Sequence, residues 1–309
     1  MKFIKLNIFI SLILMILFFS PSFLFAEVEE KTENTYQLDR DGKVYVENVS
    51  GDIIVKSWQK NEIKILARKT ARDKNLFDKV HIDINRTDSN IRIITRYDKF
   101  LGMFQSADVS VYYDIFIPDR AQLRIKSVSG NVEAWEIGGP VEAETITGKI
   151  DIVSAGQGVK CKSISGLINL DGITGDASLK TTSGKIKADG IKGSIDANSV
   201  SGDIGIKGFS LADSIEMETI KGNMGLQGEL SPGGIYEFRT ISGRIRLTLA
   251  PDSNFELRTN TVSGEMHCAF KLNDYAVYTR NRVQGVVGKG GSSLDLSSVS
   301  GDILINKGN

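Results

Sequence analysis

The sequence has few of the residues that usually bind transition metals, with two cysteines and two histidines in 309 residues. His81 and His267 are isolated, and neither has a cysteine or carboxylate cluster at ligand spacing. A zinc site needs three or four such ligands held at one place. We therefore expect both histidines to be structural, and we predict no metal site, no cofactor-binding residue and no catalytic residue.

The sequence also lacks an excess of either charge, and it is poor in proline. Lys plus Arg total 38 and Asp plus Glu total 38, so the formal net charge is zero. This balance removes the basic surface expected of a dedicated nucleic-acid-binding protein. Only 5 prolines accompany 31 glycines, a mixture that suits many tight turns without proline-rich linkers.

Residues 1–26 have the layout of a secretory signal peptide. Lys2 and Lys5 precede a long apolar run, and Pro21 and the tripeptide "LFA" stand before Glu27. This pattern predicts cleavage after Ala26 and an exported protein, in the periplasm or on the cell surface. An uncleaved membrane anchor is the alternative, because about 20 apolar residues can span a bilayer. No cysteine follows the run, so a lipid anchor is not indicated.

A short phrase recurs along most of the chain. "SVSGDI" stands at 199–204 and again at 298–303, and its glycines Gly130, Gly148, Gly166, Gly184 and Gly202 are spaced by 18 residues. The run from Val128 to Gly208 divides into nonapeptides in which positions one, five and seven are mostly apolar. Internal repetition of this kind predicts a repeat architecture, because stacked units bury a continuous core.

The spacing of apolar residues favours strands over helices. They recur at i+2 rather than at i+3 and i+4, so Ile164, Gly166, Ile168 and Leu170 are expected to face inward together. Nine is an odd number, so the alternation must reset once per unit at a corner or bulge. These features predict an all-β fold, a single-stranded parallel β-helix or solenoid with about 18–21 residues per coil.

After the signal peptide, the chain divides into three further parts on this interpretation. Residues 27–35, "EVEEKTENT", look like a charged, mobile leader. Residues 36–120 alternate apolar and polar residues between turn formers, which predicts an N-terminal antiparallel β cap, with 71–79 as a short helix. Residues 121–309 form the solenoid, and a loop insertion is expected near 271–293, where the spacing of the phrase widens.

These features together resemble a known bacterial family. The early "VYVENVSGDI", the "IP" near 117, the serial S-G-x-I phrases and the closing "GVVGKGGSSLDLSSVSGDI" are similar to exported β-solenoid proteins that carry the domain of unknown function 4097 and are named adhesins. The resemblance covers about residues 36–307. It implies a right-handed parallel β-helix in the cell envelope, and it says more about fold than about function.

Two groups of residues are of the types that bind calcium or form a disulfide. Asp52, Asp203 and Asp302 follow the phrase glycine, but calcium-binding nonapeptides carry an acid in every repeat, which this chain does not. A solvated turn is the better interpretation. Cys161 and Cys268 lie several coils apart, about 25 Å by strand spacing, so we expect two buried free thiols and no disulfide.

The acidic residues do not indicate an enzyme. A polysaccharide-cleaving site needs two carboxylates at one place, whereas these are spread along successive coils beside Lys and Arg: Glu133, Glu142, Glu144, Glu216, Glu218, Glu237 and Glu256. We expect a non-enzymatic surface or envelope protein that acts in adhesion. A periplasmic scaffold or envelope-stress component is the alternative, and a polysaccharide-acting enzyme is the weakest one.

The sequence does not identify a partner. A cell-surface glycan or protein fits an adhesin, and self-association through the terminal coil "SVSGDILINKGN" is a further expectation. Exposed aromatic residues would suit a glycan: Tyr97, Phe100, Phe104, Tyr275 and Tyr278.

Overall fold

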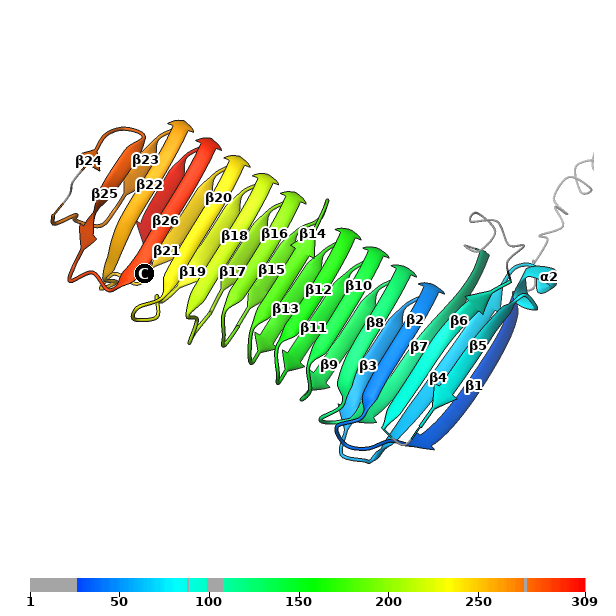
Figure 1. Cartoon of the computed structure of the whole chain (residues 1–309). Coiled ribbons are helices and arrows are strands. Elements are labelled where there is room, and N and C mark those ends of the chain that lie inside the picture. Colours follow the sequence, from blue (N-terminus) through cyan, green and yellow to red (C-terminus); the bar gives the residue numbers. More distant parts are fainter. Residues whose placement is uncertain (1–26, 88, 99–107, 275–276, 309) are drawn as a thin grey trace, which may run out of the picture.

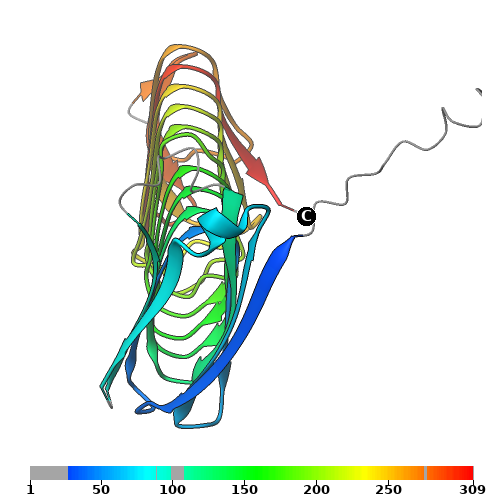
Figure 2. The same ribbon diagram turned by 90° about the vertical axis from the view of Figure 1, so that its right-hand side faces the viewer.

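The protein is a stack of flattened coils built from two long β-sheets. The computed structural model describes residues 27–87, 89–98, 108–274 and 277–308. The predicted signal peptide and the aromatic residues Phe100, Phe104 and Tyr275 lie outside these residues. Figure 1 shows the strands side by side along one axis, and Figure 2 shows the flattened coils seen along the stack. The predicted all-β solenoid is confirmed.

The two sheets face each other across the core. Sheet A contains, in spatial order, β1 (Val28–Gln37), β4 (Glu62–Ala71), β7 (Val109–Pro118), β3 (Ile53–Trp58), β9 (Val132–Ile137), β11 (Ile150–Ala155), β13 (Ile168–Ile173), β15 (Ile186–Asp189), β17 (Ile204–Lys207), β19 (Met224–Gly228), β21 (Ile245–Leu249), β27 (Ile303–Lys307) and β23 (Met266–Cys268). Sheet B contains β24 (Val277–Tyr278), β25 (Arg282–Val287), β22 (Phe255–Ser263), β26 (Ser292–Ser300), β20 (Ile235–Ser242), β18 (Ser214–Lys221), β16 (Ile195–Ser201), β14 (Ala177–Thr181), β12 (Val159–Ser165), β10 (Val141–Thr147), β8 (Gln122–Ser129), β2 (Lys43–Ser50), β6 (Asn90–Tyr97) and β5 (Val80–Arg86).

One strand from each sheet makes one coil. In the central part of the chain each strand pairs in parallel with the strand 18 residues later, as Val141 does with Val159 in sheet B and Ile150 with Ile168 in sheet A. Inward side chains alternate with outward ones and are almost fully buried. Identical positions of successive repeats therefore stack in register, and the core is a set of aliphatic rows.

The repeated phrase forms the corner that leads from sheet B to sheet A. Its glycines stack so closely that a Cβ on Gly184 would lie 1.9 Å from the carbonyl oxygen of Gly166, and one on Gly202 would lie 1.8 Å from that of Gly184. Only glycine fits such an approach of backbone to backbone. Except for Asn48 in the first copy, the residue three positions before each phrase glycine is a buried serine or threonine. These residues are in register with their neighbours, as Ser163 is with Thr181, and form a buried row of hydroxyls.

The apolar residue inside the phrase does not face the core, which corrects the prediction for position one. Ile164 is exposed, whereas Ile168 and Leu170 are buried as predicted. The alternation of β12 buries Cys161 and Ser163. Ile164 directly follows Ser163, so its side chain points outward. The alternation resets inside the phrase, between Ser163 and Ile168, rather than before Ile164 as the nonapeptide pattern suggested.

The N-terminal region differs from the prediction in two ways. Residues 27–35 are not a mobile leader, because Val28–Gln37 forms β1, which pairs antiparallel along the whole of β4. The antiparallel cap also includes β4 with β7 and β5 with β6. However, β2 and β3 pair in parallel with β8 and β9, so the first coil begins at Lys43 rather than near 121. This segment carries the same phrase, "NVSGDI", and makes the same corner. The helix expected within 71–79 is α2 (Lys74–Phe77).

The C-terminal region is not stacked in chain order. The last coil of the sequence, β26 and β27, lies between the β20–β21 coil and the β22–β23 coil (Figure 1). Both edges of β26 and of β27 are therefore paired. This corrects the expectation of self-association through the terminal coil. The predicted loop near 271–293 contains β25, which pairs antiparallel with β22.

Candidate functional site

The aspartates that follow the phrase glycine have structural partners. The Oδ1 atom of Asp52 accepts a hydrogen bond of 2.7 Å from the backbone N–H of Asn131 in the next coil. Asp203 accepts one of 2.9 Å from Asn223, and Asp302 one of 3.2 Å from Glu265. These side chains satisfy corner amides between coils. They serve coil stacking, and the group as a whole does not gather at one place.

The cysteines and histidines also lie apart. Cys161 is buried in β12 of sheet B, and Cys268 is half-buried in β23 of sheet A, and both are free thiols. Burial raises the pKa of both thiols, which disfavours the reactive thiolate. His81 lies on β5 and His267 on β23. Among the described residues, no group of three or more His, Cys, Asp or Glu side chains is arranged to hold a metal ion.

The acidic residues mostly follow rows on the outer face of sheet B, where they pair with basic ones. Glu142 lies between Arg124 and Lys160, at 3.3 Å and 3.8 Å. Farther along, Arg239 contacts Glu216 at 3.1 Å, Glu218 at 3.0 Å and also Glu237. Hydrogen bonds to Glu218 and Glu237 raise the pKa of Arg239. The three carboxylates are exposed and share one guanidinium, so this cluster is an ion-pair network on an open face.

The outer face of sheet B carries three parallel rows of side chains. Each sheet B strand of a coil presents three outward residues, such as Arg124, Lys126 and Val128 in β8. We call the first two positions the charged rows and the third the apolar ridge. The ridge consists of the residue directly before the Ser-Gly or Thr-Gly pair (Lys-Gly in one repeat) of each repeated phrase, which is aliphatic in every repeat except that of Thr182. In spatial order it contains Val49, Val128, Ile146, Ile164, Thr182, Val200, Ile220, Ile241, Val299 and Val262.

The apolar ridge is the main exposed hydrophobic feature of the described residues. From Val128 to Val262, its valines and isoleucines expose between 42% and 68% of their surface. Strands are spaced by about 4.8 Å, so the ridge runs for about 43 Å. Scattered exposed aliphatic residues are ordinary, but a continuous row marks an interaction surface.

The charged rows change sign along the stack. The half nearer the N-terminus, from β6 to β14, carries six cations and three carboxylates: Arg92, Arg124, Lys126, Lys160, Lys162 and Lys180 with Glu47, Glu142 and Glu144. The other half, from β16 to β22, carries five carboxylates and two cations: Asp196, Glu216, Glu218, Glu237 and Asp295 with Arg239 and Arg258. The face is thus basic at one end and acidic at the other.

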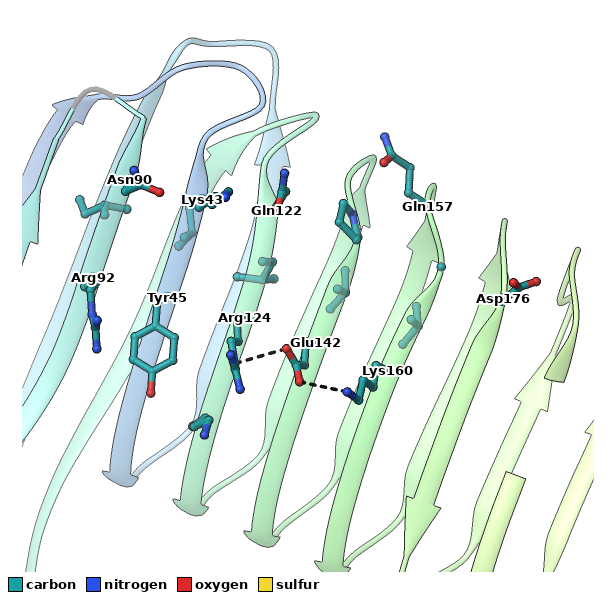
Figure 3. A pocket seen from close by; sticks show the side chains of 18 residues that line it. Lys43, Tyr45, Asn90, Arg92, Gln122, Arg124, Glu142, Gln157, Lys160 and Asp176 are labelled. Carbon is teal, nitrogen blue, oxygen red and sulfur yellow. Dashed lines mark ion pairs between the residues drawn. The ribbon is translucent and has the colours of Figure 1, made fainter. Parts of the chain in front are cut away.

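Two grooves cross this face. The larger, of about 780 Å³, lies at the basic end over β6, β2, β8, β10 and β12 (Figure 3). Tyr45 lies in it between Arg92 and Arg124, and its hydroxyl donates a hydrogen bond of 2.6 Å to Glu47. Desolvation and this hydrogen bond raise the pKa of Tyr45 to about 12. The second groove, of about 550 Å³, runs between the charged rows and the ridge from Glu47 to Thr182.

The family to which this architecture belongs is given by its sequence profile. The profile of the family called Toastrack DUF4097 matches residues 39–306. The chain belongs to the Toastrack DUF4097 family. This confirms the resemblance drawn from the repeated phrase, and it agrees with a stack of parallel strands that begins near Lys43.

Solved structures similar to this Toastrack chain are distant in sequence. A protein described as a putative adhesin from Bacteroides fragilis is 14% identical, with a TM-score of 0.46, and the match covers 89% of this chain and 97% of that one. A protein described as a putative lipid binding protein from Parabacteroides distasonis is 13% identical, with a TM-score of 0.41, covering 91% and 97%. At such scores these similarities do not decide the function.

The other comparisons give no assignment for the Toastrack chain. No curated protein matches the sequence. Over the part of the chain that the structure describes, no helix is long and apolar enough to cross a membrane. The residues of its outer face must therefore be interpreted from their own geometry.

The apolar ridge is the feature that sequence reasoning missed in this Toastrack protein. Position one of the phrase was assigned to the core because it is apolar in nearly every repeat. The signal that it faces outward was present: Ile164 follows the strand "VKCKS", whose alternation places Val159, Cys161 and Ser163 on one face. Tyr97, expected as an exposed aromatic residue, is mostly buried and donates a hydrogen bond of 3.1 Å to the Val109 carbonyl.

Proposed function

We propose that this protein is a non-enzymatic, exported cell-envelope protein that binds a macromolecular partner through the outer face of sheet B, in the manner of an adhesin. One observation carries the proposal. The apolar ridge, about 43 Å long by strand spacing, borders two rows of charged side chains on an exposed face. An apolar row bordered by polar residues is the pattern of a protein-interaction surface.

The distribution of carboxylates supports binding rather than catalysis. On this face they alternate with lysine and arginine, as Glu142 does with Arg124 and Lys160. Acid–base catalysis of glycoside cleavage instead needs a pair of carboxyl groups held on either side of the scissile bond. A periplasmic scaffold would use the same face, so the cellular location separates the two proposals.

Protease treatment of intact cells tests the location. An antibody against residues 27–309 follows the protein, and lysed cells serve as the control. We expect digestion on intact cells, and N-terminal sequencing of the exported chain to begin at Glu27. Protection until lysis would contradict a surface adhesin and favour the periplasmic scaffold.

Replacing ridge residues tests whether this face binds. The double variant Ile146→Ser and Ile164→Ser removes two exposed isoleucines of the ridge. The equivalent position of the neighbouring coil is Thr182, so the ridge already contains one hydroxyl side chain. We expect an unchanged circular dichroism spectrum and at least a tenfold loss of adhesion in a cell-binding assay. The matched control is Leu211→Ser, which removes an aliphatic side chain 78% exposed but outside the ridge. Equal adhesion of the ridge variant and the control would contradict the proposal.

A further inference from the structure

The order of charges along the outer face of sheet B fits a second copy of the chain turned end to end. A two-fold axis parallel to the strands, placed between β14 and β16, makes the outer faces of two copies meet with the stacks antiparallel. In this arrangement β2 faces β22, β8 faces β26, β10 faces β20 and β12 faces β18 of the other copy. Because strand direction is kept, each row meets the same row of the partner copy. Such two-fold interfaces require a self-complementary surface.

The charged rows are complementary in this arrangement. Four juxtapositions bring opposite charges together, and each occurs twice because of the symmetry: Lys160 with Glu216, Lys162 with Glu218, Arg124 with Asp295, and Glu144 with Arg239. Lys162 makes no ion pair within the described residues of its own chain, so its ammonium is free for a partner. Complementary rows of this kind fix the register and orientation of a complex.

Register shifts of one coil are less favourable. A shift in one direction sets Glu142 and Glu144 of β10 against Glu216 and Glu218 of β18. In the symmetric register, Glu144 faces Arg239 instead, and only Glu142 and Glu237 face each other with like charge. Like charges placed opposite each other across an interface repel, which disfavours the wrong register. The charge order therefore selects one register.

The ridge and the area of the face agree with this arrangement. Val128 meets Val299 and Ile164 meets Ile220 of the other copy, so apolar side chains cover each other. The three rows make a face about 43 Å by about 18 Å, or roughly 800 Å² per copy, which is the size of a typical specific interface. A membrane surface fits less well, because the acidic half of the charged rows contains five carboxylates and two cations, and interfacial segments favour lysine and arginine.

We propose that two copies of this chain bind each other face to face and antiparallel through the apolar ridge and charged rows of sheet B. This inference rests on the proposed function in one respect, since it names the partner of the same face. On a cell surface the pairing would link chains of one cell or of neighbouring cells. It does not use the strand edges of the terminal coil, which are already paired within the chain, but the outer face of β26.

Charge reversal with mutual rescue tests the arrangement. Analytical ultracentrifugation of the chain from Glu27 to Asn309, which contains every described residue, is expected to show a dimer that weakens as salt is raised. Lys162→Glu and Glu218→Lys alone should each weaken dimerisation at least tenfold, because each places two like-charged pairs in the interface. A mixture of the two variants should restore the dimer, since both contacts between positions 162 and 218 are again between opposite charges. Lys187→Glu, an exposed reversal on sheet A, is the control and should dimerise as the unchanged chain does.

The outcomes separate the inference from the proposed function. A monomer at all concentrations up to about 200 μM, or no rescue on mixing, would overturn the antiparallel dimer while leaving adhesion to another partner standing. Binding of monomer to anionic lipid vesicles or to a glycan in its place would also overturn it. A dimer with the expected rescue, found in cells whose protein resists surface protease, would sustain the inference and contradict the surface location.

Discussion

The glycines of the repeated phrase are required by contact between neighbouring coils. A Cβ at position 202 would lie 1.8 Å from the Gly184 carbonyl oxygen, which belongs to the backbone and cannot rotate away. The coils would have to separate or tilt there, and the hydrogen bonds on both sides of the corner would lengthen. Glycine is therefore required at this position by the stacking of neighbouring coils, and not by the local turn alone.

We predict that Gly202→Ala lowers the free energy of unfolding by about 1–3 kcal/mol or more. Gly205→Ala is the matched control three residues away, because nothing lies within 4 Å of its Cβ position. Alanine there should be neutral or stabilise by up to about 1 kcal/mol, since glycine loses more backbone freedom on folding. Urea unfolding followed by circular dichroism compares the two, and equal effects would refute the stacking argument.

The buried tyrosines predict a loss of stability at alkaline pH. Desolvation raises the pKa of Tyr97 to about 12 and also raises that of Tyr113, against about 10 in an unfolded chain. The neutral phenols therefore contribute stability that is complete below about pH 10 and is lost as pH rises toward the folded pKa, because the unfolded state ionises first. Urea unfolding at several pH values should show this decline. Tyr97→Phe should reduce the slope above pH 10, and an unchanged slope would count against burial of this phenol.

The last coil of the chain, β26 and β27, lies between two coils that precede it in the sequence. Ser298 in β26 is in register with Thr240 of β20 on one side and Thr261 of β22 on the other. The β22–β23 coil thus has no direct contact through its strands with β20–β21 and depends on β26 and β27 for attachment. The end of the stack is completed only by the final residues of the chain.

Removing residues 292–309 should therefore release the segment that follows β21. We expect trypsin to cut early at Arg258, Lys271, Arg280 and Arg282, while residues before 230 stay resistant because their coils keep both neighbours. Mass spectrometry of the fragments, with the chain from Glu27 to Asn309 as the control, reads this directly. Continued resistance would mean that β22 pairs with β20 when β26 is absent.

The whole molecule is a stack of parallel coils, and antiparallel strands cover its two ends. At the N-terminal end of sheet A the outermost strand is β1, in which Glu29, Glu30, Lys31 and Glu33 are mainly exposed. Charged residues on an edge strand disfavour pairing with another chain. At the other end, β25 lies antiparallel outside β22 and interrupts the regular stack.

Removing residues 27–37 should uncover the edge of β4. That strand is richer in buried aliphatic residues, including Ile63 and Ile65, than the strand that covers it. We expect growth of light scattering at protein concentrations where the complete chain stays clear, because an uncovered apolar edge templates further strands. A clear solution of the truncated chain would show that β1 is not needed as a cover.

Much of the fold follows from the sequence alone, because a stack of parallel strands is repetitive. The 18-residue spacing of the phrase sets the coil, its glycine sets the corner, and the hydroxyl before it sets a buried row, as Ser163 and Gly166 illustrate. These properties depend on contacts between equivalent positions of neighbouring repeats, which a regular sequence specifies by itself.

Three features were decided only by the tertiary structure. Residues 27–35 resemble a charged leader in the sequence because the pairing of β1 with β4 joins residues 25 (Gln37 and Glu62) to 43 (Val28 and Ala71) positions apart. The sequence does not predict the insertion of β26 between β20 and β22, since all copies of the phrase are alike and any two of them could be neighbours in the stack. The apolar ridge emerged only when the corner was placed, because a shift of one residue moves a side chain from the core to solvent. Local pattern thus determines the repeating unit, whereas the order and facing of the units depend on long-range pairing.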